Sequence, residues 1–169
     1  MKIFTSVTGK NMQKEEKNFM RNYRKSAEIV ELANAFEDCT LPPGKLTHEV
    51  YLTIIFRHLF FNSPAEAESL IRDSLRRYYF EHNIASTGAN GYHETLMLFW
   101  IEKISFYLEN FGAKLSFLEL ANGVIRNFKD ANLPFGFYSR ERLFSAEART
   151  KRLEPDLIGQ CEKTAAISN

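Results

Sequence analysis

Cysteine, proline and glycine are all scarce in this sequence of 169 residues, which contains 2 Cys, 5 Pro and 8 Gly. Two cysteines as far apart as Cys39 and Cys161 do not form the dense disulfide framework of a small secreted protein, so we expect reduced thiols. Many short strands joined by tight turns need more glycine and proline than this chain has. The composition therefore disfavours an all-β fold.

Long hydrophobic runs and a large net charge are also missing. The longest apolar runs, 50–56 and 95–101, end at Arg57 and Glu102, far short of the roughly 18 residues that indicate a membrane span. The opening residues MKIFTSVTGK lack the apolar stretch of a secretory signal, which favours a cytoplasmic protein. The net charge of +1 provides no overall field that would attract nucleic acid or an anionic membrane.

Basic residues gather at the start of the sequence, where residues 1–25 hold seven Lys or Arg against Glu15 and Glu16. Such an arm is most often a solvated terminus, although it is also able to contact phosphate or a partner. The following residues, 26–156, have the apolar periodicity of one helical domain, and 157–169 read as a polar tail. A single domain is expected, because a chain of this size with 44% hydrophobic residues can bury one sizeable core.

Apolar residues recur at helical spacing through nearly the whole of that domain. Ile29, Ala33 and Phe36 share one face of the first predicted helix. The order Ser63-Pro64-Ala65-Glu66 is typical of a capping box at the start of the third. We expect an all-α, single-domain bundle of about five helices plus a short C-terminal helix. The predicted helices cover residues 26–38, 47–61, 64–82, 92–110 and 116–128, with a short helix or helical turn within 140–152.

Three of the four histidines lie at helix ends on predicted apolar faces. At about 100° per residue, His48 shares a face with Ile55, and His93 shares one with Trp100. His82 continues the apolar stripe of the third helix from its last turn. Because short connections make successive helices antiparallel, the ends that carry these histidines meet at one end of the bundle. We therefore predict a polar pocket there, with His48 and His93 within about 7 Å of each other.

The predicted pocket supports two kinds of chemistry. His48 and His93 are the candidate catalytic residues, as acid, base or hydrogen-bond donors in a metal-free site. The same two imidazoles are candidate ligands of a divalent metal ion, because neutral imidazole suits Zn, Cu and Fe, although no H-E-x-x-H or C-x-x-C motif accompanies them. The candidate ligand-binding residues are Tyr51, His82, Tyr92, Glu94, Thr95, Trp100 and Arg140.

A plainer interpretation competes with each of these assignments. An imidazole on an apolar face is usually a core histidine bonded to a backbone carbonyl, and this is the role we expect of His58, which lies off the apolar centre of its helix. Arg140 follows Ser139, which can cap a short helix whose N-terminus receives an anion. An exposed turn with ordinary ion pairs would have the same sequence.

Three short motifs stand out within the predicted domain: L-T-H-E-V-Y-L at 46–52, G-Y-H-E-T-L at 91–96 and Y-S-R-E-R-L-F-S at 138–145. Together they resemble a family of small, largely uncharacterised bacterial helical proteins, over about residues 28–156. The family's first motif reads T-H-x-x-H-L, so Tyr51 stands here in place of a second histidine, and a neutral phenol is a poorer metal ligand than imidazole. The resemblance implies an all-helical fold in which His48 and His93 belong together.

The sequence favours a protein that binds a small polar or anionic molecule, either as an enzyme or without catalysis. One alternative is a non-catalytic interaction or structural protein whose working surface is the basic arm or an exposed aromatic patch at 134–138. A mononuclear metal-binding protein is another alternative. The expected partner is a small molecule, and the sequence carries no strong signal for nucleic acid or membrane.

Overall fold

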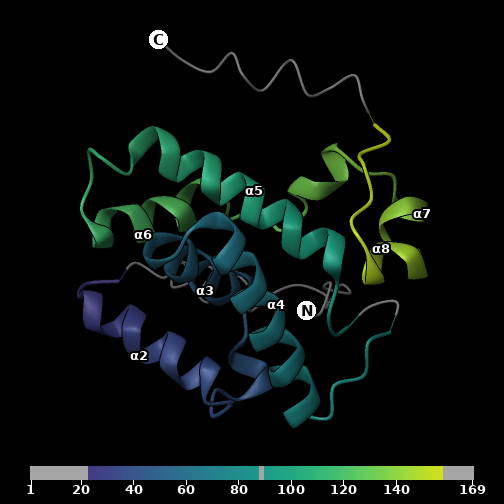
Figure 1. Cartoon of the computed structure of the whole chain (residues 1–169), viewed down its shortest axis with the longest axis horizontal. Helices are drawn as coiled ribbons and strands as arrows, with labels where there is room; N and C mark the ends of the chain where they lie inside the picture. The colour runs from purple at the N-terminus through teal and green to yellow at the C-terminus, as the bar shows by residue number, and fades with distance from the viewer. Residues whose placement is uncertain (1–22, 88–89, 158–169) are drawn as a thin grey trace, which may run out of the picture.

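Seven α-helices joined by turns and loops form the part of the chain that the computed structural model describes, residues 23–87 and 90–157 (Figure 1). Those ranges contain no strand, so the predicted all-α fold is confirmed. Most of the predicted basic arm and polar tail lies outside the described residues. The helices are α2 (Ser26–Glu37), α3 (His48–Phe61), α4 (Pro64–Glu81), α5 (Glu94–Phe111), α6 (Phe117–Asn127), α7 (Arg140–Leu143) and α8 (Ala146–Thr150).

Side-chain caps fix where the long helices begin. The Ser63 hydroxyl accepts a hydrogen bond from the backbone N–H of Glu66, whose carboxylate accepts from the Ser63 N–H in return. Ser116 and Glu119 form the same capping box at the start of α6. Thr47 caps α3 in the simpler manner, by accepting from the N–H of Val50. Each cap satisfies helix N–H groups that would otherwise have no partner.

The core is centred on α3, which packs against α2, α4, α5 and α6 (Figure 1). Leu52, Ile55 and Phe56 of α3 are fully buried, as are Met97 and Trp100 of α5. Full burial of one such apolar side chain is worth about 1.5–3 kcal/mol. The helices that carry the predicted site residues are therefore held on several sides. None of the helices in the described ranges combines the length and apolar character that a membrane crossing requires.

A glycine allows α6 to approach α5 closely. A Cβ atom built on Gly123 would lie 2.0 Å from the hydroxyl oxygen of Tyr107, far inside contact distance. Only a residue without a side chain leaves room for this phenol between the two helices. Gly123 therefore makes room for the Tyr107 hydroxyl against α6.

Two predicted boundaries are corrected by the structure. The fourth predicted helix starts at Glu94 rather than near Tyr92, because His93 has an extended backbone and caps the helix with its own side chain. The predicted helix or turn within 140–152 is two short helices. They are separate because Ser139 and Ser145 each accept a hydrogen bond from the backbone N–H three residues on, which starts a new helix each time.

Candidate functional site: a tyrosine cavity at the start of α5

His93 uses both of its ring nitrogens to hold backbone. Nδ1 accepts a hydrogen bond from the N–H of Leu96 at 3.2 Å, so Nε2 carries the proton and donates to the carbonyl oxygen of Leu143 at 2.8 Å. Burial lowers the pKa of this imidazole, and the bond to Leu143 only partly opposes that effect. The ring is therefore neutral near pH 7, and neither nitrogen is free for a substrate in this arrangement.

His48 is also bonded to a carbonyl. Its Nε2 lies 2.8 Å from the carbonyl oxygen of Phe128, the residue that follows α6. Since a carbonyl can only accept, Nε2 donates, which leaves Nδ1 as an acceptor that is buried and has no hydrogen-bond partner among the described residues. The ring packs against Trp100 with 4.9 Å between ring centroids, and burial lowers its pKa. Both predicted catalytic histidines therefore fit the plainer interpretation of a core imidazole.

His82 belongs to a third, separate environment. It is the C-cap of α4, and its ring packs on Tyr78 with 4.4 Å between centroids. The Tyr78 hydroxyl donates to the carbonyl oxygen of Leu41, which anchors the turn that follows α2. In this turn Cys39 has a free thiol and a backbone φ of 57°. The other cysteine, Cys161, lies outside the described residues.

A cavity of about 30 Å³ lies between α3, α4 and the start of α5, and we call it the tyrosine cavity. It brings together four of the predicted site residues, while His48 does not line it. By comparison, about 10–15 Å³ is needed to hold one water molecule. Besides Leu75 and Leu96, the residues that line it are Tyr51, Tyr79, Gly91, Tyr92, His93 and Trp100.

Three polar groups of the tyrosine cavity have no hydrogen-bond partner in the described part of the chain. Trp100 is fully buried, and its indole Nε1–H donates to nothing there. The hydroxyls of Tyr51 and Tyr79 likewise form no hydrogen bond with the described residues. Burial raises the pKa of Tyr51 well above its usual value and that of Tyr79 to about 12, so both phenols keep their protons. All three groups are able to donate.

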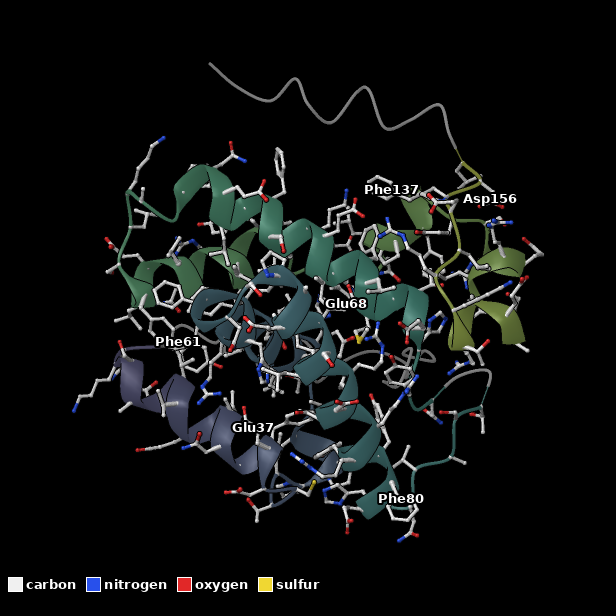
Figure 2. The ribbon with its side chains drawn as sticks, in the orientation of Figure 1. Glu37, Phe61, Glu68, Phe80, Phe137 and Asp156 are labelled. Carbon is white, nitrogen blue, oxygen red and sulfur yellow. The ribbon has the colours of Figure 1, made fainter. Side chains whose placement is uncertain are left out.

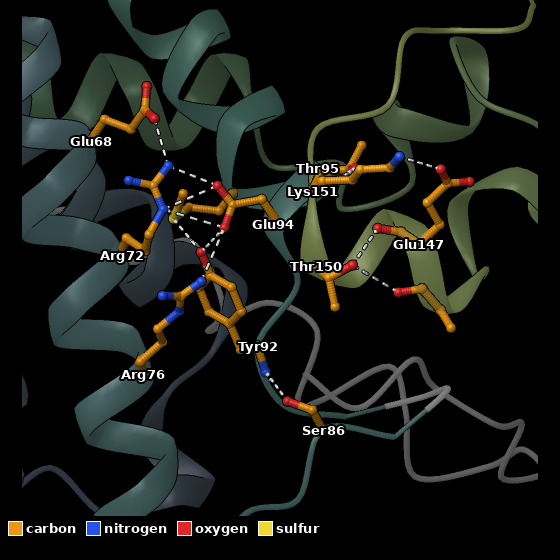
Figure 3. Close-up of polar contacts among 12 residues, drawn as sticks. Glu68, Arg72, Arg76, Ser86, Tyr92, Glu94, Thr95, Glu147, Thr150 and Lys151 are labelled. Carbon is orange, nitrogen blue, oxygen red and sulfur yellow. Dashed lines mark hydrogen bonds and ion pairs between the residues drawn. The ribbon is translucent and has the colours of Figure 1, made fainter.

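The Glu94 carboxylate lies buried beside this cavity and is held by Arg72 of α4 (Figure 3). Arg72 donates from Nε to Glu94 Oε1 at 3.1 Å and from Nη2 to the same oxygen at 2.7 Å. The Tyr92 hydroxyl donates to the other carboxylate oxygen, and Arg76 lies over the Tyr92 ring. Burial opposes ionisation of Glu94, but the bonds from Arg72 and Tyr92 outweigh it and lower the carboxyl pKa. Glu94 therefore ties α5 to α4.

Thr95 fastens the end of the described chain to α5 instead of facing the cavity. Its hydroxyl donates to the carbonyl oxygen of Lys151 at 2.8 Å and accepts from the N–H of Leu153 at 3.1 Å. Both hydrogen-bonding capacities of this buried hydroxyl are thus used by the segment that follows α8. The sequence predicts Thr95 as a ligand-binding residue, whereas in the structure its hydroxyl anchors this segment.

The anion-binding position that the sequence predicts beside Arg140 is occupied by another part of the chain. Ser139 caps α7 as predicted, but its N–H and hydroxyl both donate to the carboxylate of Asp156, at 2.8 Å and 2.5 Å. An acidic side chain of the same protein thus occupies the position that we expected for a bound anion. Arg140 lies over the ring of Phe135, with 4.5 Å to the ring centroid, and does not line the tyrosine cavity.

The aromatic residues at 134–138 do not form an exposed patch. Pro134 and Tyr138 are buried, and Phe135 and Phe137 are half-buried. The Tyr138 hydroxyl donates to the carbonyl oxygen of Leu153, and Phe137 packs against Phe99. The rings of this turn therefore complete the packing against α5 instead of forming the exposed patch that the sequence predicts.

No group of three or more His, Cys, Asp or Glu side chains within residues 23–87 and 90–157 is placed to hold a metal ion. His48 and His93, the predicted metal ligands, each direct Nε2–H at a carbonyl. The donor set of the described chain therefore does not favour the metal-binding alternative.

Sequence reasoning missed three residues that shape this region: Arg72, Tyr79 and Arg149. Arg149 donates to the carbonyl oxygens of Asn90 and Tyr92, which fixes the turn before α5 where Gly91 has a φ of 85°. Nothing in the sequence indicates such contacts across more than fifty positions. Arg72 had a signal, since it lies four residues after Glu68 on one helix face, a spacing at which opposite charges pair.

Comparison with protein-family models, curated sequences and solved structures finds no match to this chain. We therefore infer its function from the geometry of the site.

Proposed function

We propose that the protein binds a small polar molecule, which places an uncharged hydrogen-bond acceptor in the tyrosine cavity. The observation that carries this proposal is the indole N–H of Trp100, fully buried, without a hydrogen-bond partner in the described chain, on a residue that lines the cavity. A buried donor left unpaired is unfavourable by about 1–3 kcal/mol. A guest that accepts from it recovers part of that free energy.

The size and polarity of the cavity define the guest. About 30 Å³ accommodates roughly two water-sized groups, so only the terminal group of a larger ligand enters. The Trp100 indole and the protonated hydroxyls of Tyr51 and Tyr79 supply donors. A carbonyl oxygen matches this set. A carboxylate matches it less well, because the nearby Glu94 carboxylate already disfavours a negative charge on Tyr51.

Binding without catalysis is the activity that these contacts support. General acid–base chemistry needs a titratable group within hydrogen-bond reach of the substrate. Both ring nitrogens of His93 are hydrogen-bonded to backbone groups, and the Glu94 carboxylate accepts hydrogen bonds from Arg72 and Tyr92. The polar groups that remain unpaired are donors with high pKa values, which suit recognition.

Fluorescence offers a direct test, because Trp100 is the only tryptophan in the chain. Acetamide, with a carbonyl on a body of four non-hydrogen atoms, is a suitable probe. Even an ideal ligand gains at most about 1.5 kcal/mol per non-hydrogen atom, or about 6 kcal/mol for acetamide, so its Kd should be no lower than about 40 μM and the titration extends into the millimolar range. We expect a saturable change in Trp100 emission together with a rise in melting temperature. Isobutane, which has a similar size and no acceptor, should cause neither.

Two variants locate the effect. Tyr51→Phe and Tyr79→Phe each remove one donor from the cavity and should weaken acetamide binding, as measured by thermal shift. Tyr107→Phe is the matched control, since Tyr107 is buried but does not line the cavity. Unchanged emission and an unchanged melting temperature of the wild-type protein throughout the acetamide titration would refute the proposal.

A further inference from the structure

A groove of about 500 Å³ lies where α2, α3 and α4 meet, and it shares no lining residue with the tyrosine cavity. Figure 2 labels two of its residues, Glu37 on α2 and Phe61 at the end of α3. Volumes of about 300–1,000 Å³ are typical of small-molecule sites. We call this hollow the α2–α4 groove.

Two nitrogen atoms on residues of this groove are buried without a hydrogen bond. The His58 side chain is only 6% exposed, and its Nε2 has no hydrogen-bond partner in the described chain, although Glu37 Oε1 lies 3.4 Å away. The Nε of the neighbouring Arg57 is likewise buried and has no hydrogen-bond partner in the described chain. Buried polar atoms in native proteins usually have partners. Two exceptions on one hollow point to a polar group that binds there.

The charged side chains of the groove are balanced, with two of each sign. Arg57 donates to the Glu37 carboxylate at 2.7 Å, and Arg77 donates from one nitrogen to the Glu37 backbone carbonyl at 2.8 Å. This leaves other N–H groups of Arg77 available. The Asp73 carboxylate forms no hydrogen bond or ion pair with the described residues. One cation and one anion of the groove are therefore open to a ligand.

Asp73 and Arg77 lie four residues apart on α4, and side chains at this spacing are neighbours on a helix, with about 5–6 Å between their Cβ atoms. An ammonium and a carboxylate carried on one carbon atom could each meet its opposite charge across that interval. A simple anion would be repelled by Asp73, and a simple cation by Arg77. The pair therefore selects for a ligand with both charges.

The rim of the groove is apolar. Phe61 is 63% exposed and Leu70 is 43% exposed, although both side chains are large and hydrophobic. A ligand with an aliphatic or aromatic portion would cover them and remove apolar surface from water. The buried Ser74 and the half-buried Asn62 add neutral polar groups to the lining.

We propose that the α2–α4 groove binds a free amino acid with an apolar side chain. Its carboxylate lies against Arg77, its ammonium group pairs with Asp73, and its side chain packs on Phe61 and Leu70. This is a second site, distinct in place and chemistry from the tyrosine cavity.

Three probes of the same shape test the charge requirement on the full-length protein. L-Leucine carries both charges, leucinamide only the ammonium, and 4-methylpentanoate only the carboxylate. We expect isothermal titration to give the highest affinity for L-leucine, with each single-charge analogue weaker by about tenfold, because one charged hydrogen bond is lost. Equal affinity for all three probes, or no binding of L-leucine, overturns the proposal.

Two substitutions on α4 assign the charges. Asp73→Asn should weaken L-leucine and leucinamide about tenfold and leave 4-methylpentanoate unweakened. Arg77→Gln should weaken L-leucine and 4-methylpentanoate and spare leucinamide. Glu109→Gln and Arg126→Gln, at exposed positions outside the groove, are the matched controls and should change nothing. A loss that is the same for every probe in both variants contradicts the assignment. Acetamide binding at the tyrosine cavity is measured separately by Trp100 emission, so the two sites succeed or fail independently.

Discussion

The tyrosine cavity and the α2–α4 groove use polar side chains in different ways. Around the tyrosine cavity, His93, Glu94 and Tyr92 are bonded to other parts of the protein, while the lining residues Trp100, Tyr51 and Tyr79 carry donors without a hydrogen-bond partner in the described chain. Around the larger groove, Asp73 and much of Arg77 are left to solvent. Polar residues gathered at one place thus hold a fold together when their partners are internal. They are available for a ligand when their partners are missing.

If this contrast holds, substitutions near the tyrosine cavity should reduce stability, and substitutions in the groove should not. The largest effect is expected at Glu94. Glu94→Ala leaves the Arg72 guanidinium without its main partner and should lower the free energy of unfolding by about 3 kcal/mol. Urea denaturation measures the loss. Glu94→Gln keeps the side-chain volume and should lose less, whereas a change below about 0.5 kcal/mol for Glu94→Ala would show that the pair does not hold α5 to α4.

His93 should come next, because it forms two backbone bonds. His93→Ala removes the cap of α5 and strands the Leu143 carbonyl, which should lower the free energy of unfolding by about 2 kcal/mol. His93→Asn offers a sharper comparison. Asparagine caps a helix well but is too short to reach the Leu143 carbonyl. The free energy of unfolding of His93→Asn should therefore be about 1 kcal/mol higher than that of His93→Ala. If His93→Ala leaves stability intact and instead abolishes acetamide binding, the imidazole serves the ligand.

The pH dependence of stability distinguishes buried neutral histidines from exposed ones. Burial lowers the pKa of His48, His58 and His93 in the folded protein below 6.5, so the unfolded chain binds protons that the folded chain does not. The contribution of these neutral histidines to the free energy of unfolding is therefore complete above about pH 7. It falls as the pH drops through 6.5, by up to about 1.4 kcal/mol per pH unit for each histidine. Chemical denaturation at pH 7.5, 6.5 and 5.5 measures this loss. His48→Phe should make the profile shallower.

Glu94 adds a later loss at lower pH. Its carboxyl pKa is lowered in the folded protein, so its contribution is present above the usual value of 4.5 and disappears as the pH falls through the folded pKa. Loss of stability in two stages is the expected pattern. Glu94→Gln should reduce the second stage without removing it, because the carboxyl pKa values of Glu66, Glu119, Glu147 and Asp156 are lowered as well.

The smallest effects are expected in the groove. Asp73→Asn and Arg77→Gln change side chains that are exposed, and such substitutions usually alter the free energy of unfolding by no more than about 0.5 kcal/mol. Thermal unfolding without ligand should therefore give nearly the wild-type melting temperature for both variants. A large loss in either one would place the groove among the stabilising regions and remove its contrast with the tyrosine cavity.

The helices were predictable because their signals are local. Ser63 and Ser116, each followed by a glutamate three residues later, mark helix starts that the structure confirms. The split between α7 and α8 also had a signal in the sequence, at Ser139 and Ser145, but a serine alone is a weaker signal than a full capping box.

The partners of the histidines were not predictable, because they depend on contacts between distant segments. Helical periodicity indicates that His48 and His93 point inward, but the carbonyls that they meet belong to Phe128 and Leu143, 80 and 50 positions away. Helical periodicity also places His58 off the apolar centre of α3, a position from which the sequence predicts a structural role only. That position brings it to the edge of the core, beside the α2–α4 groove.

Thr95 anchors the last described residues to α5. Through this hydroxyl and the carboxylate of Asp156, the segment from Lys151 onward is fastened to α5 and to the start of α7. A truncation before Lys151 would therefore expose the buried Thr95 hydroxyl. It would also remove the Asp156 carboxylate that accepts hydrogen bonds from Ser139 at the start of α7. Tags or fusion partners are best attached beyond residue 157, where they leave these contacts intact.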